Sequence, residues 1–137
     1  MKKGITFGAF DLFHAGHILM LEEARTVCDH LIVAIQTDPS LDRETKNSPV
    51  QSIEEREIQV SACRYVDEVI IYDRENDVLE ILDKLDWDLR IIGEEYKDKY
   101  FTGREQSLEK CYFNKREHSF SSSELRERVA KEHFKGK

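Results

Sequence analysis

Several features that define other classes of protein are scarce in this chain of 137 residues. Its three cysteines are odd in number, far apart and at no zinc-binding spacing. We therefore expect reduced thiols in a reducing compartment, and neither a disulfide framework nor a structural zinc site. There are only two prolines, and no linker, repeat or low-complexity stretch interrupts the sequence. The length then predicts one ordinary domain.

Long hydrophobic runs and basic clusters are also missing. No apolar run approaches the roughly 20 residues that cross a bilayer, and the first residues do not resemble a signal peptide, so we expect a cytoplasmic protein without a membrane partner. The 21 basic residues face 28 acidic ones, a formal charge of −7. This balance argues against a nucleic-acid partner, because most of the affinity for nucleic acids comes from contacts of basic side chains with phosphates. A polyanionic ligand must be held by a few local cations.

The apolar residues that are present alternate between strand-like and helix-like patterns. Short, nearly continuous apolar runs predict buried strands at 4–7, 30–35, 68–72 and 89–92. Apolar residues at helical spacing predict helices between these runs and after the last of them. Ser52 with Glu55, and Ser121 with Glu124, have the form of capping boxes at helix starts. We expect the inner face of the helix after Ser52 to carry Ile58, Ala62 and Cys63.

Strands that alternate with helices predict an α/β fold with a mostly parallel sheet flanked by helices on both faces. We assign residues 1–131 to this single domain and residues 132–137 to a C-terminal tail. In such sheets ligands bind at the carboxyl ends of the strands, where the strand order reverses. This predicts the location of a site without naming its ligand.

The most informative stretch, residues 8–17, joins the first predicted strand to the first predicted helix. Gly8 can take positive φ or let a ligand approach closely. Gly16 lets phosphate oxygens reach a helix start, where free N–H groups favour an anion. His14 and His17 can share one face there and stabilise charge on a transferring phosphate. Alternatively, they are chance surface residues or two ligands of a metal, although no third ligand is evident nearby.

Three motifs resemble those of the cytidylyltransferase-like nucleotidyltransferases. They occur in the family's order over about residues 1–130, and the length and spacing are most similar to those of the short bacterial glycerol-3-phosphate cytidylyltransferases. The first motif, G-A-F-D-L-F-H-A-G-H at 8–17, is similar to the HxGH signature. The second, C-R-Y-V-D-E-V at 63–69, is similar to the RYVDEV segment of cytidylyltransferases for glycerol 3-phosphate, choline phosphate and ethanolamine phosphate. The third, F-S-S-S-E-L-R at 120–126, is similar to the ISSTxIR-type motif.

The resemblance implies a Rossmann-like fold, a homodimer and an activity. The activity is transfer of CMP from CTP to a small phosphorylated alcohol such as glycerol 3-phosphate, with release of pyrophosphate. Mg²⁺ would be held by the nucleotide's phosphates, and no protein metal ligands are implied.

The resemblance also implies site residues, matched position by position. The catalytic residues would be His14, His17, Lys46 and Arg116, all spread over the triphosphate. The nucleotide-binding residues would be Gly8, Phe10, Asp11, Gly16, Gly93, Ser121, Ser122 and Ser123. The substrate-binding residues would be Asp11, Asp38, Arg64 and Asp67. Without the resemblance, Lys46 is equally a solvated lysine, Arg64 a salt-bridge partner of Asp67, and the serines a helix cap.

Departures from the pattern keep other functions open. Ala15 stands where the glycerol-3-phosphate enzymes have Trp, and H-A-G-H also occurs in adenylyltransferases such as the domain that activates heptose 1-phosphate. An adenylyltransferase that uses ATP on a sugar phosphate is therefore one alternative, although the R-Y-V-D-E-V match favours CTP. A non-catalytic nucleotide-binding module and a flavodoxin-like redox or regulatory domain are the others.

Overall fold

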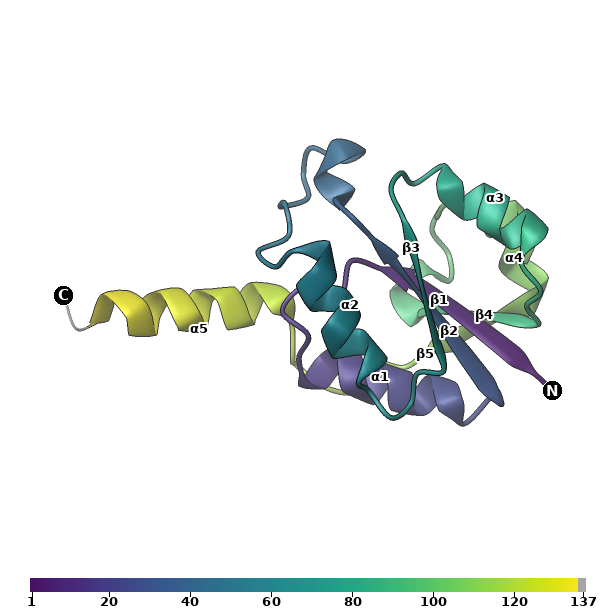
Figure 1. Cartoon of the computed structure of the whole chain (residues 1–137), viewed down its shortest axis with the longest axis horizontal. Helices are drawn as coiled ribbons and strands as arrows, with labels where there is room; N and C mark the ends of the chain where they lie inside the picture. Colours follow the sequence, from purple (N-terminus) through teal and green to yellow (C-terminus); the bar gives the residue numbers. More distant parts are fainter. Residues whose placement is uncertain (136–137) are drawn as a thin grey trace.

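The computed structural model describes residues 1–135 and contains one sheet of five parallel strands (Figure 1). The strands are β1 (Lys3–Gly8), β2 (His30–Gln36), β3 (Glu68–Tyr72), β4 (Leu89–Gly93) and β5 (Cys111–Asn114). Their order in space is β3-β2-β1-β4-β5. After β3 the chain crosses back to the other side of β1, which places the reversal of strand order between β1 and β4.

Helices cover both faces of this sheet, which confirms the predicted Rossmann-like α/β fold. The helices are α1 (Ala15–Arg25), α2 (Ile53–Ser61), α3 (Asp77–Lys84), α4 (Arg104–Ser107) and α5 (Ser122–Lys135). The α1 and α2 helices pack on one face and α3 on the other. Because β2 is buried on both faces, its residues alternate between the two cores: Leu31 contributes to the first and Ile32 to the second.

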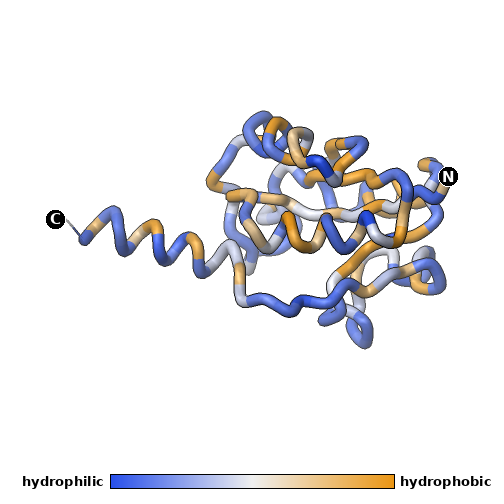
Figure 2. The backbone as a smooth tube through the Cα atoms, turned by 90° about the horizontal axis from the view of Figure 1, so that it is seen from below, coloured by the Kyte–Doolittle hydropathy of each residue, from blue (hydrophilic) through white to orange (hydrophobic). Residues whose placement is uncertain are grey.

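The last helix stands apart from this body (Figure 1). None of its residues is buried, and hydrophilic and hydrophobic positions alternate along it (Figure 2). Val129, an apolar residue of this helix, is 59% exposed. The predicted boundary between 131 and 132 falls inside α5, and residues 136–137 of the predicted tail lie outside the described residues. That boundary stays a prediction.

The start of α2 confirms one prediction and its inner face overturns another. Ser52 Oγ accepts from the Glu55 N–H, and Glu55 Oε1 accepts from the Ser52 N–H, both at 3.1 Å. The buried residues of α2 are Arg56 and Val60, however, whereas Ile58 is 64% exposed. Ala62 and Cys63 lie beyond the end of the helix. The physical reason is that a cluster of backbone carbonyls lies beneath α2, and a guanidinium satisfies it where an apolar side chain could not.

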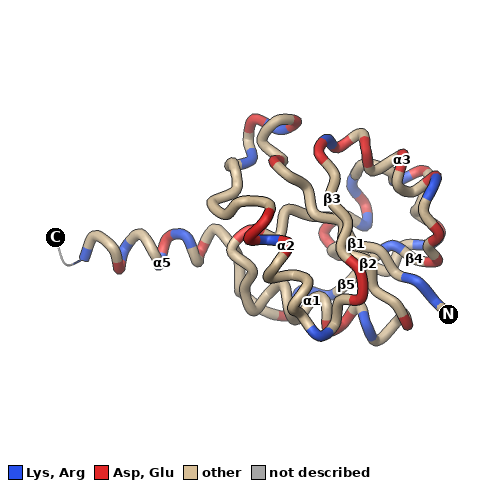
Figure 3. Tube along the Cα trace, viewed as in Figure 1, with Lys and Arg blue, Asp and Glu red and all other residues tan. Residues whose placement is uncertain are grey.

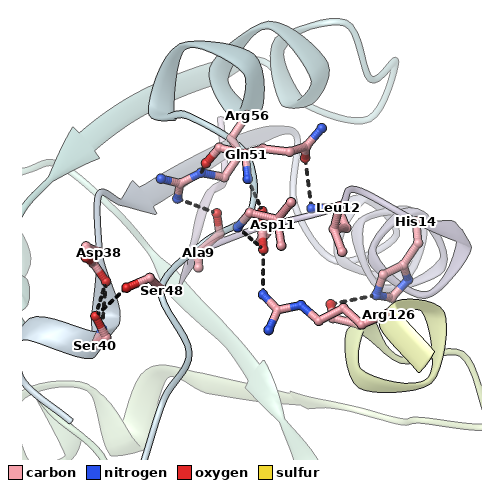
Figure 4. A network of polar contacts seen from close by, with 12 residues as sticks. Ala9, Asp11, Leu12, His14, Asp38, Ser40, Ser48, Gln51, Arg56 and Arg126 are labelled. Carbon is pink, nitrogen blue, oxygen red and sulfur yellow. Dashed lines mark hydrogen bonds and ion pairs between the residues drawn. The ribbon is translucent and has the colours of Figure 1, made fainter. Parts of the chain in front are cut away.

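Arg56 is 2% exposed and joins three segments through their carbonyls (Figure 4). Its Nη1 donates to Ala9 O at 3.0 Å and Gln36 O at 2.6 Å, and its Nη2 donates to Thr37 O at 2.6 Å. Its Nε donates to two carbonyls at the start of α2. The loop after β1, the end of β2 and the start of α2 are therefore held together by one side chain.

We predict that Arg56→Met lowers the free energy of unfolding by about 3–5 kcal/mol, because it leaves several buried carbonyls without a donor. Urea unfolding followed by circular dichroism measures this loss. Arg74→Met is the matched control: Arg74 is a half-exposed arginine paired with Asp42 at 2.8 Å, and its loss should leave the unfolding midpoint almost unchanged. Equal midpoints for the two variants would refute the structural role of Arg56.

Candidate active site

Two adjoining cavities of about 390 and 350 Å³ lie at the carboxyl ends of β1 and β4, beside the reversal of strand order. The first extends over the loop after β2, and the second extends toward α1 and the end of β5. His17 and Ser122 border both cavities. Lys and Arg are scattered among Asp and Glu along the described chain (Figure 3).

A reciprocal pair of hydrogen bonds fixes His14 and His17 at the start of α1. The Gly16 N–H donates to His14 Nδ1 at 3.0 Å, and the His14 N–H donates to His17 Nδ1 at 3.1 Å. Because each Nδ1 accepts, each ring carries its proton on Nε2. The ring centroids are 3.9 Å apart. His14 Nε2 lies 3.1 Å from Ser122 Oγ, so the imidazole pair meets the start of α5 (Figure 4).

Both imidazoles are neutral donors at neutral pH. Burial, with help from the charge of His14, lowers the pKa of His17 to about 4, although Asp11 opposes the shift. Burial also lowers the pKa of His14, and the nearby His118 and Arg116 add to this. Two neutral N–H groups at a helix start can bind phosphate oxygens without requiring protonation.

Asp11 ties the loop after β1 to two distant segments (Figure 4). Its carboxylate accepts from the Val50 N–H at 2.8 Å, the Gln51 N–H at 2.9 Å and the Arg126 guanidinium at 2.8 Å. Burial alone would raise the pKa of Asp11, but these hydrogen bonds more than offset it and hold the pKa below its usual value. Asp11 is thus an ionised, well-bonded anchor, and through Arg126 it fixes the first turns of α5.

Arg90 places a buried cation beside both cavities. It is 5% exposed, and its guanidinium lies 4.8 Å from the centre of the Phe7 ring and 5.0 Å from that of Phe101. Its Nη1 donates to Thr102 O at 2.7 Å, whereas the buried Nε has no hydrogen-bond partner among residues 1–135. The sequence signal for Arg90 is a cation inside the apolar run L-R-I-I, to which the strand pattern assigned no role.

The structure brings the predicted catalytic and nucleotide-binding residues together around the two cavities. The first cavity is lined by Gly8, Phe10, Asp11, Lys46 and Ser123. The second is lined by His14, Gly16, Gly93, Arg116 and Ser121. Their individual roles stay predictions.

Three predicted substrate residues line neither cavity. Asp38 caps the turn at Pro39–Leu41 and accepts from the Ser40 N–H at 3.0 Å. Arg64 and Asp67 precede β3 and therefore lie at the amino edge of the parallel sheet, opposite the site. Within one chain these two residues therefore lie away from both cavities, and their role in substrate binding stays a prediction.

The alternative pairing of Arg64 with Asp67 is also wrong. Asp67 accepts from Arg25 and from the Leu31 N–H, the latter at 2.8 Å. Arg64 donates to Tyr65 Oη at 2.9 Å. Asp67 therefore joins α1 to the amino ends of β2 and β3.

Several residues that line the cavities were not predicted from the sequence. They are Gln36, Arg43, Arg90, Asn114, His118 and Arg126. Arg126 closes the third motif and could have been found there, whereas most of the others lie in loops or at strand ends that carry no periodic pattern. Within residues 1–135, no three His, Cys, Asp or Glu side chains gather as a metal site, and no helix is long and apolar enough to cross a bilayer.

An anion-binding helix start at the switch point of a parallel sheet is typical of nucleotide-binding α/β proteins. The cytidylyltransferase-like family model matches residues 5–128, and the chain belongs to this family. It is accordingly a nucleotidyltransferase enzyme.

Individual relatives agree with this membership. The chain is 35% identical over 131 residues to glycerol-3-phosphate cytidylyltransferase of Bacillus subtilis, covering 95% of this chain and 98% of the relative. It is 37% identical over 125 residues to the bifunctional protein HldE of Campylobacter jejuni, of which it spans only 27%. The crystal structure of the lipopolysaccharide core biosynthesis protein from Thermoplasma volcanium has the same fold, with a TM-score of 0.61, 22% identity and coverage of 97% of this chain and 89% of that one.

The lowered pKa of His17 predicts a pH window for stability. Between pH 6.5 and about 4 the unfolded chain binds a proton at this position that the folded chain does not. The contribution of His17 to the free energy of unfolding is therefore fully present above pH 6.5. It is lost on acidification, by at most about 3 kcal/mol. Urea unfolding at pH 7.5, 6 and 5 measures the loss. His17→Gln should flatten the profile, whereas His133→Gln, at an exposed position of α5, should not; parallel profiles for wild type and His17→Gln would contradict the assignment.

Proposed function

We propose that this enzyme transfers CMP from CTP to a small phosphorylated alcohol similar to glycerol 3-phosphate. The observation that carries the proposal is the junction of His14, His17 and Ser122, which lies between two cavities at the switch point. The relative that the chain matches almost end to end is a glycerol-3-phosphate cytidylyltransferase, which favours CTP and a glycerol phosphate acceptor.

The proposed reaction is an in-line displacement at the α-phosphorus. An oxygen of the acceptor's phosphate forms the new P–O bond while the bond to the α,β-bridging oxygen breaks, and pyrophosphate leaves with that electron pair. A phosphate dianion is already nucleophilic, so the protein need supply no nucleophile. Catalysis then rests on positioning and on stabilisation of charge, the pattern of phosphoryl transfer in general.

The two cavities divide the substrates in this proposal. The triphosphate lies in the second cavity, at the start of α1 and beside Arg116 and the serine cap. The acceptor's phosphate lies in the first cavity, which Lys46 lines. His17 borders both, and its Nε2–H would face the α-phosphoryl group at the moment of transfer.

Mg²⁺, a homodimer and a cytoplasmic location complete the proposal. Mg²⁺ favours phosphate and water oxygens over an all-protein cage, so the nucleotide would bring the ion, which neutralises charge on the leaving pyrophosphate. Exposed apolar side chains on α1 and α2, among them Leu19 and Ile58, are suited to contact with a second copy. Light scattering after size exclusion tests the dimer: a monomer mass at tens of micromolar would reject it.

Pyrophosphate release tests the activity. We expect the highest turnover with CTP and glycerol 3-phosphate. Turnover should fall when ATP replaces CTP, and when choline phosphate, ethanolamine phosphate or a sugar phosphate replaces glycerol 3-phosphate. His17→Ala should lower the rate by about 10²–10³ with the fold intact, because it removes a donor to the transition state. His133→Ala, in exposed α5, is the control. Turnover with ATP and a sugar phosphate alone would replace the proposal by adenylyl transfer, and nucleotide binding without turnover would indicate a binding module.

A second pair of variants tests the division of the cavities. Lys46→Ala should raise KM for the acceptor by about tenfold with little change in CTP affinity, because the lost cation faces only the first cavity. Arg116→Ala should have the opposite pattern. Initial rates at varied acceptor and varied CTP separate the two effects. Equal loss of CTP affinity in both variants would instead place both cations on the triphosphate.

A further inference from the structure

His118 supplies a third imidazole to the second cavity, outside the H-A-G-H motif. It lies in the loop between β5 and α5, two residues after Arg116, and is half-buried. A Cβ added to Gly16 would lie 2.8 Å from His14 Cε1 and 2.9 Å from His118 Cε1. The two rings thus converge on one point above the start of α1. Gly16 leaves room for both.

The loop around His118 sets which nitrogen carries the proton. The Phe120 N–H donates to His118 Nδ1 at 3.1 Å, and the ring stacks on Phe120 with centroids 5.4 Å apart. With Nδ1 as acceptor, the neutral ring carries its proton on Nε2. No residue between 1 and 135 has a hydrogen bond to this Nε2. His118 therefore resembles His14 and His17, in which a backbone N–H also holds Nδ1 and the proton lies on Nε2. His14 Nε2 already contacts Ser122 Oγ.

The charge balance of the second cavity explains why an additional N–H donor would help to bind a triphosphate. A nucleoside triphosphate brings about four negative charges, whereas the cations that line this cavity are Arg90 and Arg116, and Glu95 opposes them. The lowered pKa values of His14 and His17 leave those rings neutral at pH 7. Additional N–H donors are then the available way to stabilise the phosphates.

We propose that His118 is a third imidazole donor, which binds the β- and γ-phosphates through Nε2–H. The proposal rests on the proposed function for its nucleotide. His17 borders both cavities and so lies at the place of transfer, whereas His118 lines only the second cavity, beside Arg116. His118 is thereby assigned to the part of the nucleotide that leaves as pyrophosphate.

Two variants separate donation by Nε2 from the structural role of Nδ1. His118→Gln keeps an N–H near the position of Nε2, and His118→Asn keeps an acceptor near the position of Nδ1. Calorimetric titration without acceptor measures binding of CTP, inorganic pyrophosphate and CMP. We expect His118→Asn to weaken CTP and pyrophosphate by about tenfold and CMP by less than about twofold, which is the loss of one hydrogen bond. His118→Gln should restore most of the affinity.

Every other pattern overturns the assignment. Equal loss in both variants would make His118 a loop-positioning residue, and loss in His118→Gln alone would assign the effect to Nδ1. Unchanged CTP affinity in His118→Asn, or equal weakening of CMP, would remove the ring from the phosphates. In each of these cases, pyrophosphate release by the wild type would leave the proposed function standing. If the wild type binds neither CTP nor ATP, the proposed function itself fails, and this proposal fails with it.

Discussion

The site depends on the contact between one buried guanidinium and the carbonyls at the carboxyl edge of the sheet. Arg56 holds the end of β2, the loop after β1 and the start of α2 in one position. That loop carries Asp11, whose carboxylate accepts from the backbone N–H groups of Val50 and Gln51, just before α2, and from the Arg126 guanidinium of α5. The imidazole pair follows three residues later. Stability and site geometry are therefore properties of one polar network at this edge.

The parts of the fold that could be predicted are those with a continuous or periodic apolar pattern. β1 to β4 and α1 to α3 each have one, and their positions follow within a few residues. β5 and α4 have four residues each, too few to show a period. The inner face of α2 was misplaced because a hydrophobicity pattern assumes that buried positions are apolar, and Arg56 breaks that assumption by bonding carbonyls from distant segments.

The candidate site divides in the same way. His14, His17 and the serine cap lie inside short motifs, so residue type and spacing predict them. The pairing of Asp11 with Arg126 spans 115 positions in the sequence, and the convergence of His118 on Gly16 spans about as many; such contacts depend on how the whole sheet folds. Arg64 and Asp67 precede the strand predicted at 68–72, so the strand pattern itself places them at the amino end of β3; only the resemblance gave them a substrate role.

The position of α5 has a thermodynamic consequence. Its first two turns contact His14 and Asp11, while the remainder extends from the body, and no residue of the helix is buried. A helix of 14 residues is marginal by itself in water, so its order depends on what holds its beginning. Any anion bound at Ser122 would stabilise the whole helix. Reciprocally, any partner that binds the far end of α5 would raise the affinity of the site for that anion. Binding at the far end of α5 and binding of an anion at the site are therefore thermodynamically coupled.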